Sequence, residues 1–154
     1  MSLEKIINEA WENKDQVNQN SDKSLKNAVD QIITDLDNGK SRVAEKINGE
    51  WVTHQHLKKA IMLSFRLYGM STMAGPYSTW IDKSHLLKGK TAGWTNADFE
   101  KAGFRMVPNT AARRGSFVGK SAVLMPCYVN IGACLLYTSP SPRDATLSRM
   151  PSSA

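Results

Sequence analysis

Cysteine is scarce in this chain of 154 residues, which contains only Cys127 and Cys134. Two cysteines are too few for a disulfide framework, and no second group of His or Cys residues stands at the spacing of a zinc site. We therefore expect no bound metal and a protein of the reducing cytoplasm.

Long apolar runs are also missing. No window approaches the 18 or so apolar residues that a membrane-spanning helix needs, and the N-terminal stretch MSLEKIINEAWENKDQ lacks the apolar centre of a signal peptide. The sequence thus predicts a soluble cytoplasmic protein with no membrane partner. With 41% hydrophobic residues, the chain can bury the core of one compact domain, or of one small domain and the start of another.

Positive charge is present but not concentrated. The formal net charge of +6 allows an anionic partner, yet the Lys and Arg residues stand singly or in pairs among acidic ones. The sequence has no Gly-x-Gly-x-x-Gly motif and no aromatic residues among clustered basic residues for stacking on bases. A nucleic-acid partner is therefore not expected.

Two amphipathic helices are predicted near the N-terminus. Ser2 can cap the first, with Glu4 near the positive end of its dipole. The second follows the i, i+3, i+4, i+7 spacing of a buried helix face and stops at Asp37-Asn38-Gly39. The apolar positions are Ile6, Ile7, Ala10 and Trp11 in the first helix and Leu25, Ala28, Val29, Ile32, Ile33 and Leu36 in the second.

A hairpin and a third helix come next. Asn48-Gly49 is the residue pair that most readily forms a tight hairpin turn, and it separates a strand around Val43 to Ile47 from one that begins at Trp51. Helical spacing then returns, with Thr53 as the expected cap. The predicted buried face of this helix consists of Leu57, Ala60, Ile61, Ser64, Phe65 and Tyr68.

Periodicity disappears between Gly69 and Gly93, where we expect an irregular connection with one strand near residues 77 to 81. Order returns at Thr95 and Asp98, which have the spacing of a capping box before a short helix that ends at Gly103.

A period of six residues follows. Residues spaced by six fall into three columns. Two columns are mainly apolar and the third contains small residues, as the stacked coils of a parallel β-helix require. The alternative is two or three short strands with coincidental spacing. The columns are Ala111, Phe117, Val123 and Val129; Ala112, Val118, Leu124 and Asn130; and Gly115, Ser121, Cys127 and Ala133.

The pattern ends abruptly after Ala133. Residues 134–154 are rich in Ser, Pro and Arg, with Pro140 and Pro142 removing donors from any strand. One interpretation is a flexible native tail. We favour another, in which the reading frame has entered cloning or sequencing-adapter DNA, so that the tail is disordered and not native.

Three stretches carry a family resemblance: RVAEKINGEWVTHQHLKKAIMLSFRL, GFRMVP and SAVLMPCYVNIGA. They resemble the N-terminal half of the tetrahydrodipicolinate N-succinyltransferases, acyltransferases of lysine and diaminopimelate biosynthesis. The resemblance runs from about Leu3 to Ala133 and is loose in the middle.

This resemblance implies an α/β fold with an N-terminal α/β domain at residues 1–104, and the start of a left-handed parallel β-helix of hexapeptide repeats at residues 105–133. It implies a cytoplasmic homotrimer with active sites between subunits, of which this chain would be an inactive fragment. The implied reaction transfers a succinyl group from succinyl-CoA to ring-opened, hydrated tetrahydrodipicolinate, giving N-succinyl-2-amino-6-oxopimelate and CoA.

The resemblance assigns one site residue. Arg105 in GFRMVP matches the family's substrate-binding arginine, and a guanidinium can hold one carboxylate of a dicarboxylate through two parallel hydrogen bonds. Without the resemblance, a surface salt bridge would be the default interpretation. The catalytic groups are expected beyond Ala133, so no catalytic residue is assigned.

For other residues that could bind a metal or act in catalysis, we favour a structural role. His54 and His56 are two apart, which suits the start of a helix better than joint metal binding. Cys127 lies in the column of small residues, so steric fit explains it better than nucleophilic catalysis. A non-enzymatic interaction module of a truncated hexapeptide-repeat protein stays open as the alternative function, because an uncovered coil edge can recruit another strand.

Overall fold

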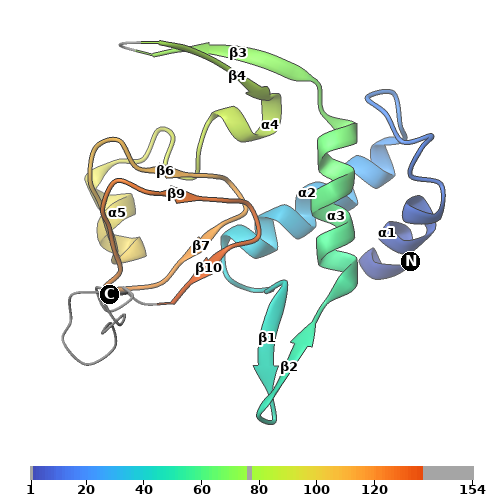
Figure 1. Cartoon of the computed structure of the whole chain (residues 1–154), viewed down its shortest axis with the longest axis horizontal. Helices are drawn as coiled ribbons and strands as arrows, with labels where there is room; N and C mark the ends of the chain where they lie inside the picture. The colour runs from blue at the N-terminus through green and yellow to red at the C-terminus, as the bar shows by residue number, and fades with distance from the viewer. Residues whose placement is uncertain (1, 76–77, 137–154) are drawn as a thin grey trace, which may run out of the picture.

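The computed structural model describes residues 2–75 and 78–136. Three helices pack against one another at one end of the molecule, and coiled short strands form the other end (Figure 1). These helices are α1 (Leu3–Glu12), α2 (Lys23–Asp37) and α3 (Gln55–Leu67). Mixed helix and strand structure is thus confirmed. No helix within the described residues is long and apolar enough to cross a bilayer.

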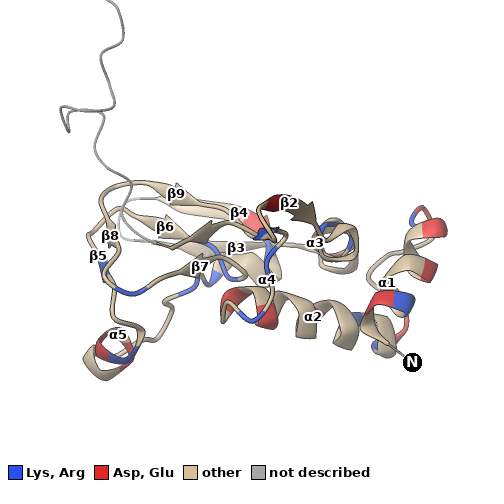
Figure 2. Ribbon diagram, turned by 90° about the horizontal axis from the view of Figure 1, so that it is seen from below, with Lys and Arg blue, Asp and Glu red and all other residues tan. Residues whose placement is uncertain are grey.

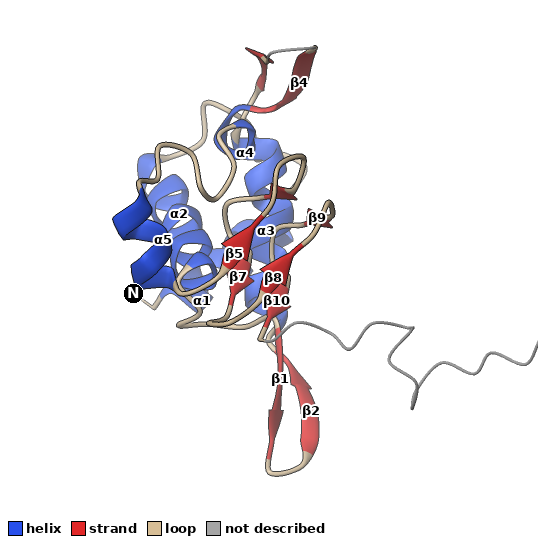
Figure 3. Ribbon diagram, turned by 90° about the vertical axis from the view of Figure 1, so that its left-hand side faces the viewer, coloured by secondary structure: helices blue, strands red, loops and turns tan. Residues whose placement is uncertain are grey.

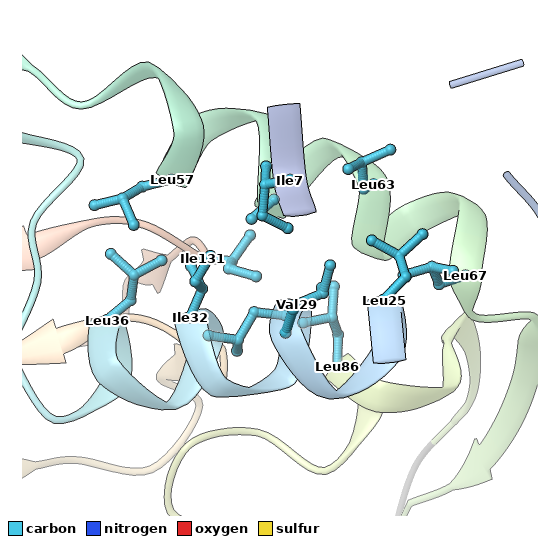
Figure 4. Packing of buried hydrophobic residues seen from close by; sticks show 13 residues of the cluster. Ile7, Leu25, Val29, Ile32, Leu36, Leu57, Leu63, Leu67, Leu86 and Ile131 are labelled. Carbon is cyan, nitrogen blue, oxygen red and sulfur yellow. The ribbon is translucent and has the colours of Figure 1, made fainter. Parts of the chain in front are cut away.

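Both N-terminal helices follow the predicted pattern. The Ser2 side chain caps α1 by accepting a hydrogen bond from the Lys5 N–H at 3.3 Å, and Ile7 is fully buried. All six predicted apolar positions of α2 are buried. Figure 4 shows these side chains meeting those of α3 and Leu86 in one core, which Ile131 joins from the coil.

The first hairpin is confirmed, and it projects away from the helices (Figure 3). Strands β1 (Ala44–Ile47) and β2 (Glu50–Thr53) pair antiparallel, and Asn48 and Gly49 have the positive φ angles of 50° and 90° that the turn requires. The Thr53 cap is wrong: Thr53 pairs with Ala44 as the last residue of β2, and His54 takes the N-cap position of α3.

The expected irregular connection is a second antiparallel hairpin. It consists of β3 (Met70–Ala74) and β4 (Thr79–Lys83), followed by the short helix α4 (Ser84–Leu87). Of the strand expected at residues 77 to 81, only the part from Thr79 lies in β4, and residue 77 lies outside the described residues. Neither face of this hairpin is buried, so no alternation of apolar residues marked it.

Helix α5 (Asn96–Ala102) has the predicted capping box. The Asp98 carboxylate accepts hydrogen bonds from the backbone N–H and the hydroxyl of Thr95, each at 2.7 Å. Gly103 ends the helix in the left-handed conformation, with φ of 73°. The chain then enters the coil within two residues.

Six short strands form two stacked turns of chain. Each strand of the first turn pairs in parallel with the strand three further along, so β5 pairs with β8, β6 with β9 and β7 with β10 (Figures 1 and 3). The bounds are β5 (Arg105–Met106), β6 (Ala111–Ala112), β7 (Phe117–Val118), β8 (Val123–Leu124), β9 (Tyr128–Val129) and β10 (Cys134–Leu135).

The predicted columns are wrong after Leu124, because the period shortens by one residue. Only three residues separate β8 from β9, so Val129 pairs with Ala112 and takes the buried position that Asn130 was expected to fill. Gly132, and not Ala133, has the positive φ angle of the small-residue column, and it stacks on Gly115, to whose carbonyl its N–H donates.

Ala112, Val118, Leu124 and Val129 build the interior of the coil together with Phe104 and Ala122. Strand β10 continues the coil two residues beyond the boundary expected at Ala133, and Leu135 packs against this interior. The rest of the expected tail, residues 137–154, lies outside the described residues.

Candidate functional site

Arg105 lies where the helical part of the chain passes into the coil. It is exposed in β5, and its backbone N–H donates to the Ala122 carbonyl at 2.9 Å. The buried Phe104 separates it from the end of α5 at Gly103. Because both flanking segments are fixed, the backbone that carries the guanidinium is held on a rigid support.

A hollow of about 340 Å³ opens beside Arg105, between β5 and α5. Phe99, Phe104 and Met106 supply its apolar surface, and Asn96 and Glu100 supply polar groups from α5. The rings of Phe99 and Phe104 lie 5.8 Å apart and edge to face, and Trp94 packs against both.

The chemistry of this hollow suits a small polar ligand with an apolar stem. The guanidinium of Arg105 can donate two parallel hydrogen bonds to a carboxylate, and the carboxylate and amide of Glu100 and Asn96 can accept hydrogen bonds. Among the described residues, those that line the hollow include neither a second arginine nor a histidine. Asn96 and Glu100 could not be predicted from the sequence, since nothing in its pattern marks which face of α5 borders the hollow.

A second hollow, of about 450 Å³, lies between the end of α2, α5 and the coil. Lys90 and Asp37, which line this hollow, have a structural role. The Lys90 Nζ lies 3.0 Å from Asp37 Oδ2 and donates to the Asp37 carbonyl at 2.8 Å, while the Gly115 N–H donates to Asp37 Oδ1 at 2.7 Å. These bonds fasten the coil to the end of α2. Acidic and basic residues also occur together on α5, along one side of this hollow (Figure 2).

A Ser–His pair links α3 and α4, and it serves packing. His85 Nε2 lies 3.2 Å from Ser64 Oγ, but Ser64 is fully buried and its hydroxyl donates to the Ile61 carbonyl at 2.6 Å. Burial lowers the pKa of His85 from 6.5 to about 4, so the ring is neutral at pH 7. A buried serine whose hydroxyl is already engaged cannot reach a substrate, which excludes this pair as a nucleophile and base.

Tyr68 and Asp30 extend the same polar cluster. The Tyr68 hydroxyl donates to Asp30 Oδ2 at 2.5 Å, and its ring stacks on His85 with centroids 4.3 Å apart. Burial, followed by the hydrogen bond to Asp30, raises the pKa of Tyr68 to about 12. Arg114 approaches Asp30 from the coil at 3.6 Å. The cluster therefore ties α2, α3, α4 and the coil together.

His54 and His56 contact different carboxylates. His54 Nε2 lies 2.7 Å from Glu45 Oε1, and His56 Nδ1 lies 3.7 Å from Glu4 Oε1. No group of His, Cys, Asp or Glu that could hold a metal ion occurs in the part of the chain that the structure describes. Cys127 is exposed, so the steric explanation for it is wrong, because the shortened turn removes it from the crowded corner.

The comparisons with known proteins agree on one family. The family model described as tetrahydrodipicolinate N-succinyltransferase N-terminal matches residues 2–67, which include α1 to α3 and the first hairpin. A protein of Pelagibacter ubique named 2,3,4,5-tetrahydropyridine-2,6-dicarboxylate N-succinyltransferase is 65% identical over 131 residues, or 85% of this chain and 48% of that protein.

More distant relatives bear the same name. The protein of Nitrosomonas europaea is 48% identical over 132 residues, and that of Escherichia coli is 47% identical over 132 residues. Each alignment covers 85% of this chain and 47% of the relative. The chain thus spans about half the length of the curated relatives it matches. Residues 2–67 thus match the N-terminal model of the tetrahydrodipicolinate N-succinyltransferases, and the similarity to proteins of that name extends over 85% of the chain.

Proposed function

We propose that the whole protein to which this chain corresponds transfers the succinyl group of succinyl-CoA to ring-opened, hydrated tetrahydrodipicolinate. The products are N-succinyl-2-amino-6-oxopimelate and free CoA, a step of lysine and diaminopimelate biosynthesis. The observation that carries this proposal is the 65% identity over 131 residues to a protein named as such a succinyltransferase.

Arg105 is the substrate-binding residue in this proposal. It stands exposed at the edge of a hollow with an apolar surface, and its guanidinium suits one carboxylate of a dicarboxylate substrate. The groups that activate the amine and stabilise the oxyanion belong to the part of the protein beyond Ala133. No catalytic residue is assigned within the present chain.

The proposed architecture has an α/β domain at residues 1–104 and the first coils of a left-handed parallel β-helix at residues 105–133. Three parallel strand pairs at intervals of 18, 17 and 17 residues support the β-helix, because three six-residue sides make a coil of 18 residues and the shortened turn before β9 removes one. Residues 134–154 are the non-native tail of this proposal, apart from the two residues that form β10.

The complete protein is proposed to work as a cytoplasmic homotrimer with active sites between subunits. Within residues 78–136, the outer edges of β9 and β10 pair with no further strand. We therefore expect the 154-residue chain alone to be inactive and prone to aggregation.

The test is to sequence the source locus past the codon for Ala133, express the complete product and measure CoA release from succinyl-CoA with tetrahydrodipicolinate as acceptor. The proposal expects a frame that continues through further hexapeptide repeats, acceptor-dependent CoA release by the complete product, and none by the 154-residue chain. A complete gene without further repeats, or a product without acceptor-dependent release, would overturn it in favour of a non-enzymatic interaction module.

A further inference from the structure

Two opposite charges share the hollow beside Arg105 without neutralising each other. Arg105 and Glu100 both line it, yet neither forms an ion pair with any residue in the ranges 2–75 and 78–136. Two other charged residues along this segment differ. Asp98 is held by Thr95 in the capping box, and Lys90 is held by Asp37.

The positions of these two charges are fixed by the local structure. Asn96 and Glu100 are four residues apart on α5 and therefore lie on the same side of that helix. Gly103 ends α5, and Phe104, which is 6% exposed, anchors the connection to β5 in the coil interior. Arg105 and Glu100 thus line one hollow from two rigid elements.

A cation and an anion that face one hollow but do not pair are complementary to a zwitterion. The carboxylate of an α-amino acid can be held by the guanidinium, and its ammonium can be held by the glutamate. A plain dicarboxylate gains only the first interaction and is repelled by the second group. The aromatic surface formed by Phe99 and Phe104 suits the methylene chain that joins the polar ends of such a ligand.

We propose that Glu100 is a specificity-determining residue, which selects ligands with an α-amino acid head group over dicarboxylates without an amino group. Arg105 binds the carboxylate of that head group, and Glu100 binds its ammonium. This inference rests on the proposed function, whose acyl acceptor carries its amine beside a carboxylate. Glu100 acts on the bound, protonated form of the ligand, and removal of the proton before acyl transfer belongs to groups beyond the present chain.

The test is isothermal titration calorimetry of the complete protein at pH 7 with 2-aminopimelate and with pimelate, which differ only by the amino group. Wild type should bind 2-aminopimelate about tenfold more tightly, the equivalent of one charge-assisted hydrogen bond. Glu100→Gln should lower that affinity about five- to tenfold and leave pimelate unchanged or tighter. Glu50→Gln, the same change at an exposed position in β2, should alter neither.

The outcomes separate this inference from the proposed function. An unchanged preference for 2-aminopimelate in Glu100→Gln would overturn the inference, and so would the absence of binding of either ligand to wild type. Arg105→Lys should weaken the binding of both ligands. If Arg105→Lys weakens the binding of neither ligand while Glu100→Gln abolishes the preference for 2-aminopimelate, the Arg105 assignment fails and Glu100 keeps its role. Acyl transfer by the complete protein is measured separately, and unfolding temperatures within about 2 °C of wild type would show that each variant is folded.

Discussion

The backbone N–H of Gly132 donates a hydrogen bond of 2.8 Å to the carbonyl of Gly115, directly below it in the coil. Both glycines have positive φ angles, of 83° and 87°. This corner faces the helices: a Cβ added to Gly115 would lie 2.8 Å from Ile131 and 3.1 Å from Ile33, and one added to Gly132 would lie 2.8 Å from Ile61. The missing side chains therefore allow the coil to approach α2 and α3.

We predict that Gly115→Ala and Gly132→Ala each lower the free energy of unfolding by about 2 to 4 kcal/mol, because a strained φ angle and a steric clash act together. Urea unfolding followed by circular dichroism measures this. Gly49→Ala is the matched control, since Gly49 has φ of 90° but nothing within 4 Å of the added Cβ. It should cost only about 1 kcal/mol, the strain alone. Equal losses at all three positions would show that close packing is not the reason for glycine in the coil.

The ion pair between Lys90 and Asp37 should contribute more to stability than an exposed pair. Lys90 is only 6% exposed, and Asp37 also accepts the hydrogen bond from Gly115. Lys90→Met keeps the apolar stem and leaves the carboxylate without its cation, so we expect a loss of about 2 kcal/mol. Lys5→Met breaks a pair of 3.8 Å in which both side chains are more than half exposed, and should cost less than about 0.5 kcal/mol. Similar losses in the two variants would contradict the structural role of Lys90.

The elements with a buried face could be predicted from the sequence. Helix α2 displays its six buried residues at helical spacing, and Asn48-Gly49 specifies the turn of the first hairpin whatever surrounds it. The hairpin of β3 and β4 could not be found in this way, because both of its faces are mainly exposed and apolar residues such as Trp80 and Ile81 do not alternate toward a core.

The coil could be predicted only as far as Leu124, where its regular period of six residues is interrupted. A constant period of six placed Asn130 in the interior, whereas the three-residue turn at Met125, Pro126 and Cys127 moves Val129 there. The candidate site could be predicted from the sequence only in part. Arg105 came from the family resemblance, and the role of Glu100 depends on how α5 is turned by the packing of Trp94 and Phe104, which no local pattern encodes.

His85 should make the stability of the chain depend on pH. Burial lowers its pKa to about 4, against 6.5 in the unfolded chain. Between these values the unfolded state binds more protons, so the free energy of unfolding rises with pH from about 4 to 6.5 and is fully regained above that range. The charged groups around the ring are Asp30, Asp82, Arg113 and Arg114.

The expected contribution of His85 is on the order of 2 kcal/mol, after allowance for partial solvent exposure. Urea unfolding at pH 4.5, 5.5 and 7 measures it. His85→Phe keeps an aromatic ring beside Tyr68 and removes the titrating group, so its free energy of unfolding should fall less steeply toward low pH. Parallel pH profiles for the variant and wild type would show that other groups cause the acid sensitivity.

Arg105 should determine the affinity of the complete protein for its acceptor and leave the affinity for succinyl-CoA unchanged. Arg105→Lys retains the charge but loses the planar fork that can hold a carboxylate through two hydrogen bonds. We expect KM for tetrahydrodipicolinate to rise about 10- to 100-fold, the equivalent of roughly 1.5 to 3 kcal/mol, with KM for succinyl-CoA within about twofold of wild type. Arg66→Lys makes the same change in an exposed pair with Asp15 on the helical side of the molecule, and should leave both constants unaltered. If Arg105→Lys lowers kcat and leaves both KM values unchanged, the guanidinium acts in the transition state and does not anchor the substrate, because only an interaction made equally in the ground state raises KM alone.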